Sequence, residues 1–302
     1  MTFGSVTDNA TAVRMVDLCL DRGVNFFDTA NFYNFGKAET ILGTILKGRR
    51  DRLVLASKVG MKMGDAADDF GLSYRAILKN IDDSLRRLQT DYIDIYYLHR
   101  PDASVSIEET LRAMDELVKL GKVRYVGLSN YAAWQVCKML WVCDVNGYQA
   151  PTITQPMYNL LARGIEQEYV PFCREFNVSL VVYNPLARGL LAGAPLSQAN
   201  IKDRPIESYE SSLDRYHHPA YFKAVEKLQS VAENAGRSLI DISLNWLLHH
   251  TSTDCVILGA NNVEQIKQNL DVLEHGPLAD ETLAGCNHVW QELGAVTPRY
   301  NR

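Results

Sequence analysis

The chain has 302 residues, of which 47% are hydrophobic and 22% are charged, and its formal net charge is −5. This composition is typical of a globular protein and excludes a disordered chain, a collagen-like repeat and a small disulfide scaffold. The mildly acidic balance gives no indication that nucleic acid is a partner.

Short apolar runs rich in β-branched and aromatic residues alternate along the chain with longer stretches of helical period. Such runs are typical of strands that are buried on both faces. In chain order, the predicted strands cover residues 24–28, 53–58, 92–98, 123–127, 152–156, 178–183 and 255–258.

The stretches between these runs predict helices. Apolar residues recur at helical spacing from Tyr74 to Leu88. Residues 106–120 begin with the pattern of a capping box and are followed by Gly121, a residue that commonly ends helices. Residues 238–250 form another helix directly before the last predicted strand. Repeated strand–helix units of this kind build a parallel sheet with right-handed crossovers.

The predicted fold is therefore an α/β protein, a (β/α)8 TIM barrel whose first strand is truncated at the N-terminus. Residues 1–4 are the candidate for that strand and are too few to form it fully. No linker interrupts the pattern, so we expect one domain over residues 1–302. Residues 191–219 have neither a helical nor a strand period, and a loop of this length predicts a functional, lid-like segment.

Reactive residues of such barrels lie at the carboxyl ends of the strands. Asp28 ends the first predicted strand and is soon followed by Tyr33, Lys58 ends the second, and His99 follows the third. A tyrosine is too weak an acid at neutral pH unless a nearby ammonium favours its phenolate form. The four residues could thus supply an acid (Tyr33), a lysine that tunes it, a carboxylate that holds the lysine, and an imidazole that orients a carbonyl oxygen.

Each of these residues also has a plain structural explanation. Lys58 could belong to a structural ion pair, Asp28 could cap a turn, and His99 could be a partly buried histidine with satisfied hydrogen bonds. The functional interpretation depends on four suitable groups at neighbouring strand ends.

These residues resemble the aldo-keto reductase superfamily. The resemblance runs from residue 1 to the end of the chain and is carried by Asp28-Thr29-Ala30 with Tyr33 and Gly36, Lys58, Leu98-His99-Arg100-Pro101-Asp102, Gly127-Leu128-Ser129-Asn130, Gln155-Pro156-Met157-Tyr158-Asn159 and Tyr183-Asn184-Pro185-Leu186.

The resemblance implies a barrel that binds a nicotinamide dinucleotide without a Rossmann domain, with Asp28, Tyr33, Lys58 and His99 as the catalytic tetrad. It also implies four groups of cofactor-binding residues. They are Ser129, Asn130 and Gln155 at the carboxamide; Tyr183 on the nicotinamide ring; Asn184, Pro185, Leu186, Arg188, Gly189 and Leu190 at the pyrophosphate; and Gly259, Asn261, Gln265 and Asn269 at the adenosine end.

The adenosine end departs from the family pattern. Many relatives that prefer NADPH carry Lys, Arg or Ser directly after the last strand, whereas residues 259–262 read Gly-Ala-Asn-Asn and contain no cation. Arg188, Lys202 or Arg204 could supply the charge instead. NADP(H) is the expected cofactor and NAD(H) the alternative. A further interpretation is that the two asparagines only cap the final helix.

The predicted function is NAD(P)H-dependent reduction of an aldehyde or ketone carbonyl to an alcohol, with Tyr33 as general acid. The alternative is a regulatory protein that binds the cofactor but turns it over slowly or not at all. The expected partner is a small-molecule carbonyl compound, with Phe32, Phe35, Met61, Trp134 and aromatic residues of the long loop, Tyr216 among them, as candidates for its pocket.

Other classes of partner are not indicated. The sequence suggests no metal site and no membrane span, and it does not reveal an oligomeric state. Without an export signal or a C-x-x-C pair among six cysteines, the chain is predicted to be cytoplasmic with reduced thiols.

Overall fold

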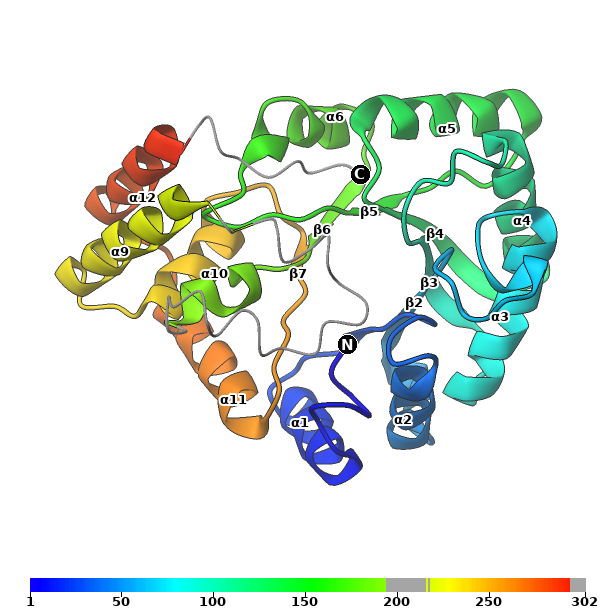
Figure 1. Ribbon diagram of the computed structural model, residues 1–302, viewed down its shortest axis with the longest axis horizontal. Coiled ribbons are helices and arrows are strands. Elements are labelled where there is room, and N and C mark those ends of the chain that lie inside the picture. Colours follow the sequence, from blue (N-terminus) through cyan, green and yellow to red (C-terminus); the bar gives the residue numbers. More distant parts are fainter. Residues whose placement is uncertain (194–215, 217, 294–302) are drawn as a thin grey trace.

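The computed structural model describes residues 1–193, 216 and 218–293. Its seven strands form one parallel sheet in which each strand pairs with the next along the chain. Figure 1 shows this sheet curled through the middle of the molecule, with helices outside it. The strands are β1 (Phe26–Asp28), β2 (Val54–Val59), β3 (Ile93–Leu98), β4 (Val123–Ser129), β5 (Ile153–Gln155), β6 (Ser179–Val182) and β7 (Cys255–Val256).

Helices connect successive strands and cover the outside of the sheet (Figure 1). They are α1 (Asn9–Asp21), α2 (Lys37–Leu46), α3 (Tyr74–Leu88), α4 (Ile107–Lys119), α5 (Ala133–Asn146), α6 (Tyr169–Glu175), α9 (Pro219–Asn234), α10 (Leu239–His249), α11 (Val263–Asp271) and α12 (Asp280–Leu293). Short 3-10 helices lie at Arg50–Arg52, Ala67–Asp69, Gly164–Glu166, Ala187–Ala192 (η4) and Val272–His275.

Each of the seven predicted runs overlaps one of these strands, although β2 and β4 extend one and two residues beyond their runs, so the predicted α/β barrel architecture is confirmed. α3 has its predicted bounds. At the start of α4, Ser106 accepts a hydrogen bond from the amide of Glu109, as a capping box requires. A capping box would also have the Glu109 carboxylate accept from the amide of Ser106. This part of the prediction is wrong, because the carboxylate accepts instead from the amide of Tyr74. The carboxylate therefore ties α4 to the start of α3 instead of closing its own helix.

The two edge strands of the described sheet are β1 and β7. Between them, residues 1–7 add no strand and form only an isolated bridge between Phe3 and Thr7. This segment is held at the end of β7 by two hydroxyl groups. Thr2 donates to the carbonyl of Ala260 at 3.1 Å, and Thr7 donates to the carbonyl of Asn261 at 2.9 Å.

The apolar core has two layers, because the side chains of each strand alternate between the barrel interior and the surrounding helices. The inner layer contains Ala56, Ile95 and Tyr97. The ring of Tyr97 lies against Gly127 of β4, where a Cβ would approach a ring carbon to 2.4 Å. Gly127 therefore provides the space that lets a tyrosine ring lie across the barrel.

Replacing Gly127 with alanine should lower the free energy of unfolding by about 1–3 kcal/mol, because the added methyl group must displace the Tyr97 ring. Urea denaturation measures this change. The double substitution Gly127→Ala with Tyr97→Leu should recover part of the loss, since leucine leaves room for the methyl group. If Gly127→Ala were as stable as the parent, the close packing of this ring would be contradicted.

The predicted lid-like loop lies mostly outside the described residues. Of its ends, Leu191 and Ala192 belong to η4, and Pro219 is the first residue of α9. The single-domain prediction and the lid both stay predictions.

No described helix is both long and apolar enough to cross a membrane. The described residues also hold no cluster of three or more His, Cys, Asp or Glu side chains that could bind a metal ion. All six cysteines are free thiols.

Candidate active site

Four side chains predicted from the strand ends meet at the carboxyl end of the sheet. Asp28 is the last residue of β1, Lys58 lies in β2, and His99 directly follows β3. Tyr33 lies in the turns between β1 and α2. The parallel register between neighbouring strands brings these elements to the same end of the barrel.

A buried ion pair joins two of these residues. The Nζ atom of Lys58 contacts Oδ1 of Asp28 and donates to the carbonyl oxygen of Thr29 at 2.9 Å. The second carboxylate oxygen of Asp28 accepts from Nε2 of Gln155 at 2.8 Å, a contact made across the barrel from β5. Burial lowers the pKa of Lys58, and the carboxylate of Asp28 partly opposes that effect. Asp28 thus holds the ammonium in place and favours its charged form.

Tyr33 and His99 face this pair. Nζ of Lys58 lies 5.3 Å from the centroid of the Tyr33 ring. The Tyr33 and His99 rings are 5.9 Å apart between centroids and nearly perpendicular, at 82°. A positive charge at this position favours the negative form of the phenol as its proton leaves. The geometry therefore suits an acid whose conjugate base is stabilised by the neighbouring ammonium.

His99 is partly buried and neutral. Burial, together with the charges of Lys58 and Arg100, lowers the pKa of His99 from 6.5 to about 3. Its backbone amide donates to the carbonyl of Val59 at 2.9 Å, which ties the end of β3 to β2. Nδ1 of the ring is buried and has no hydrogen-bond partner among the described residues. A neutral imidazole can hydrogen-bond a carbonyl oxygen without changing its own charge.

The lowered pKa of His99 predicts a pH dependence of stability. Between pH 6.5 and about 3 the unfolded chain binds a proton at His99 that the folded chain does not bind. The free energy of unfolding should therefore be highest, as far as His99 is concerned, above pH 6.5, and should fall as the pH falls through that window. The slope from this one group is up to about 1.4 kcal/mol per pH unit.

Urea denaturation at several pH values between 4 and 8 measures that slope. His99→Gln should reduce it, whereas His288→Gln, on α12 with a side chain that is 71% exposed, should leave it unchanged. Equal slopes in the parent and in His99→Gln would contradict the partly buried, neutral histidine.

The residues predicted at the carboxamide form a connected network. Ser129 Oγ donates to the carbonyl of Gln155 at 2.9 Å, and Asn130 Nδ2 donates to the carbonyl of His99 at 2.9 Å. The Tyr183 hydroxyl donates to Oδ1 of Asn130 at 2.8 Å. Asn130 has a left-handed backbone, with φ 64°, a conformation that asparagine tolerates better than most residues. The strand ends β3, β4, β5 and β6 are thereby fixed relative to one another around the tetrad.

The residues predicted at the pyrophosphate form a strained turn after β6. Asn184, Ala187, Arg188 and Gly189 all have positive φ angles. Oδ1 of Asn184 accepts from the amide of Arg188 at 2.8 Å, and its carbonyl accepts from Nδ2 of Asn159 at 2.9 Å. Strained backbone of this kind is kept where the surrounding structure enforces it, and it occurs often at ligand sites. Pro185, Leu186 and Leu190 complete this segment.

The residues predicted at the adenosine end lie in the turn after β7 and on α11. Asn262 accepts from the amide of Gln265 and so caps α11, as one interpretation of the sequence proposed. Asn261 does not act as a side-chain cap; its amide donates to Oε1 of Gln265 at 2.8 Å. Asn269 lies within 3.5 Å of the carbonyl of Gly259. Residues 259–262 contain no cation, and the nearest lysine on α11, Lys267, pairs with Asp271.

Two observations are consistent with these residues binding a dinucleotide. Nδ1 of His99, buried beside the ion pair, leaves a polar atom for a bound molecule to contact. Arg188 and Gly189 lie in a turn of positive φ angles, and backbone amides in such turns can form a concave surface that binds anions. Lys202 and Arg204 lie outside the described residues.

The sequence analysis did not identify Tyr97 as a residue of the site. Tyr97 is fully buried, and its ring centroid lies 5.6 Å from Nζ of Lys58. Burial raises the pKa of Tyr97 well above 10, and the charge of Asp28 adds to this effect, so the phenol is neutral. The period of β3 could have found this residue, because Tyr97 and His99 are two positions apart and face the same side.

Sequence reasoning also missed a polar cluster behind β2. Glu39 of α2 is fully buried, accepts from the hydroxyl of Ser57, and pairs with Nε of Arg87 at 2.7 Å. Because Ser57 precedes Lys58, this cluster fixes the strand that carries the lysine. Nothing in the local pattern of the sequence indicates such a contact between α2, β2 and α3.

The candidates for the substrate pocket differ in their surroundings. Phe35 is 70% exposed and Trp134 is 64% exposed. Tyr216 is buried, and its hydroxyl interacts with Asn159 and Asn184. Tyr216 thus supports the turn after β6.

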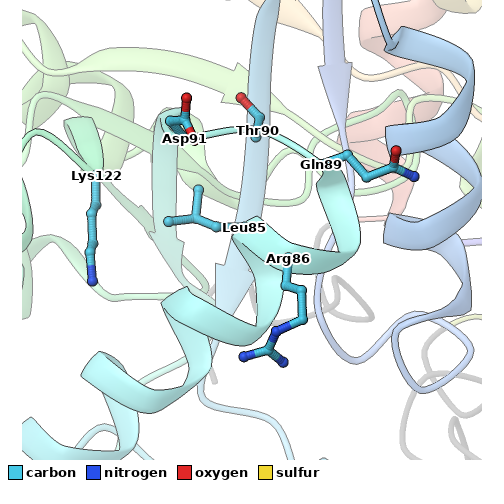
Figure 2. Close-up of a pocket in the computed structure, with 6 residues that line it drawn as sticks. All are labelled: Leu85, Arg86, Gln89, Thr90, Asp91 and Lys122. Carbon is cyan, nitrogen blue, oxygen red and sulfur yellow. The ribbon is translucent and has the colours of Figure 1, made fainter.

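Two grooves lie away from this site, at the amino-terminal end of the strands. Figure 2 shows one of them, lined by the end of α3, the turn after it, and the residue before β4 (Leu85, Arg86, Gln89, Thr90, Asp91 and Lys122). The other lies below β6 and β7 and includes Arg174, Ser179 and Asp254. Neither contains a member of the tetrad, so the carboxyl end remains the candidate active site.

Comparison with known families identifies the fold and its chemistry. A sequence model described as the aldo/keto reductase family matches residues 1–291. This chain belongs to the aldo/keto reductase family. The reductase is accordingly an oxidoreductase, and its family uses nicotinamide cofactors.

Individual relatives resemble the reductase over most of their length. Aflatoxin B1 aldehyde reductase member 4 of Homo sapiens is 35% identical, with 99% of this chain and 95% of the relative covered. A probable voltage-gated potassium channel subunit beta of Arabidopsis thaliana is 34% identical, with 92% and 86% covered. Aldo-keto reductase YhdN of Bacillus subtilis (strain 168) is 32% identical, with 86% and 78% covered.

Proposed function

We propose that this reductase converts an aldehyde or ketone carbonyl to an alcohol with NADPH as the cofactor, and that Tyr33 is the general acid. The observation that carries the proposal is the convergence of an acid, an ammonium, a carboxylate and a neutral imidazole at one end of the barrel. A nicotinamide cofactor supplies the hydride when it is bound.

The residues of the chain provide the proton and the position of the carbonyl. The Tyr33 hydroxyl transfers its proton to the carbonyl oxygen as negative charge develops there. Lys58 stabilises the phenolate that remains, and Asp28 keeps the ammonium in place. His99, neutral because its pKa is about 3, donates a hydrogen bond that orients the same oxygen.

Ser129, Asn130 and Gln155 would hold the carboxamide, and Tyr183 would lie on the nicotinamide ring. Gln155 has a further role in this proposal, because it also holds Asp28. A contact between cofactor and tetrad through one side chain would align the two before the reaction. The turn from Asn184 to Leu190 would hold the pyrophosphate through its backbone amides, which would leave the Arg188 side chain for another phosphate group.

The preference for NADPH requires a cation for its 2′-phosphate, and Arg188 is the candidate among the described residues. Arg188→Ala should weaken NADPH binding about tenfold and change NADH binding little, because an arginine–phosphate contact is strong and charge-assisted. Fluorescence titration of both cofactors measures this. An equal loss for both would contradict recognition of the 2′-phosphate by Arg188.

The proposed function is tested by parallel titration with NADPH and NADH, followed by oxidation of the bound cofactor with a generic aromatic aldehyde. Binding of NADPH with turnover that depends on Tyr33 is expected. Cofactor binding without turnover of any aldehyde or ketone would favour the regulatory alternative. The similarity to a probable potassium channel subunit beta is the reason to test this alternative. The complete tetrad favours the enzyme.

A further inference from the structure

Helix α5 is apolar on the side that faces solvent as well as on the side that faces the core. Its inner side is built from Val136, Met139, Val142 and Cys143, all buried. Its outer side carries Trp134, Trp141 and Val145, which are 64%, 63% and 64% exposed. A surface helix in a globular protein normally has a polar outer side. An exposed stripe with two tryptophans indicates that another surface covers it.

The outer residues have the spacing of a helix-packing seam. Trp134, Lys138, Trp141 and Val145 follow one another at intervals of four, three and four, which places them in one line along the helix. α4 and α6 pack on the two sides of α5. Figure 1 shows α5 along the upper rim of the molecule, outside the strands that it connects. The line is therefore accessible along the length of the helix.

We propose that this seam, the outer face of α5, is the interface of a symmetric dimer in which the α5 helices of two copies pack antiparallel. In such a pair, the seam of one copy is complementary to the same seam of the second copy. Trp134 packs against Val145 of the second copy, so a large side chain meets a smaller one at each end. Lys138 packs against Trp141 of the second copy, so both central layers place an ammonium on an indole face.

The charges on the helix complement this arrangement. Lys138 and Asp144 are both exposed, and neither forms an ion pair among the described residues. Asp144 is three residues beyond Trp141, about one helical turn along the axis. In the antiparallel pair, Asp144 of one copy therefore lies within reach of Lys138 of the other. Each dimer gains two such pairs by symmetry.

The tryptophans of the seam supply the apolar centre of such an interface. Four tryptophans, about two-thirds exposed in the separate chains, would bury on the order of 500 Å². A stable interface buries about 1,200–2,000 Å² in total. In the proposed dimer the remainder comes from the exposed sides of α4 and α6, which flank α5. Tryptophans at the centre of an interface commonly dominate its binding energy.

Sedimentation equilibrium of the full chain over a wide range of concentrations tests the proposal. The parent should sediment as a dimer at micromolar concentrations. Trp141→Glu should raise the dissociation constant by at least about thirtyfold, as expected for a central tryptophan. Lys223→Glu, the same kind of charge change at an exposed position of α9, should leave it unchanged. Carbonyl reduction and thermal stability should be retained in Trp141→Glu, since Trp141 is not among the candidate active-site residues.

A charge exchange separates the proposed register from a general loss of apolar surface. Lys138→Glu should weaken the dimer, because it places two carboxylates together, and Lys138→Glu with Asp144→Lys should restore much of the affinity. A parent that remains a monomer at 100 μM would overturn the proposal, as would a dimer whose dissociation constant Trp141→Glu does not change. Failure of the exchanged pair to recover affinity would overturn the antiparallel register.

Discussion

Replacing Tyr33 with phenylalanine is expected to lower kcat by about 100- to 10,000-fold, the range that a positioned general acid contributes. The substitution removes one oxygen atom and leaves the ring, which lies 5.3 Å from Nζ of Lys58 and 5.9 Å from the ring of His99. The shape of the site should thus be kept while its acid is lost. The dissociation constant for NADPH should change by less than about twofold. Steady-state oxidation of NADPH with an aromatic aldehyde, together with fluorescence titration, measures both quantities.

A second tyrosine provides the matched control. Tyr125, near the amino-terminal end of β4 and 52% exposed, loses the same hydroxyl in Tyr125→Phe without approaching the tetrad. That variant should retain kcat. If Tyr33→Phe turned over as fast as the parent, the proton would have to come from another donor and the assignment of Tyr33 would fail.

The order of strands and helices could be predicted from the sequence because the central strands are largely buried on both faces. Val54–Val59 and Ile93–Leu98 are nearly continuous apolar runs, and the turns around them contain the residues that break helices and strands. The ends of strands were less well predicted. Of the predicted run 255–258, only Cys255–Val256 forms a strand. A strand extends only as far as its neighbours form matching hydrogen bonds, and β7, at the edge of the described sheet, has one neighbour.

The members of the candidate site could be predicted because a parallel barrel brings all strand ends together, whatever their distance in the sequence. The contacts among them could not. Gln155 holds Asp28 although 127 residues separate them. Glu109 was assigned to its own helix cap, yet it accepts from Tyr74. Such pairings depend on side-chain direction in the folded chain, and local sequence patterns carry no information about it.

Replacing Lys58 with methionine is expected to lower both activity and stability. The ammonium is 1% exposed and lies against a carboxylate that is 6% exposed. Without it, Asp28 would keep a buried charge that accepts a hydrogen bond from Gln155 but has lost its ammonium partner, and loss of one member of such a pair costs about 3–5 kcal/mol. Activity should fall by about 100-fold or more, because the phenolate of Tyr33 would lose the positive charge that stabilises it. Urea denaturation and steady-state kinetics measure the two losses.

The double substitution Asp28→Asn with Lys58→Met separates charge from packing. It removes both members of the ion pair, and replacing a buried pair by neutral groups is often nearly neutral for stability. Most of the lost free energy of unfolding should therefore return, while kcat stays low because the ammonium is still absent. If the double variant were as unstable as Lys58→Met, the cost would come from the packing of the lysine side chain. If Lys58→Met kept its activity, the positive charge beside Tyr33 would have no part in the transfer of the proton.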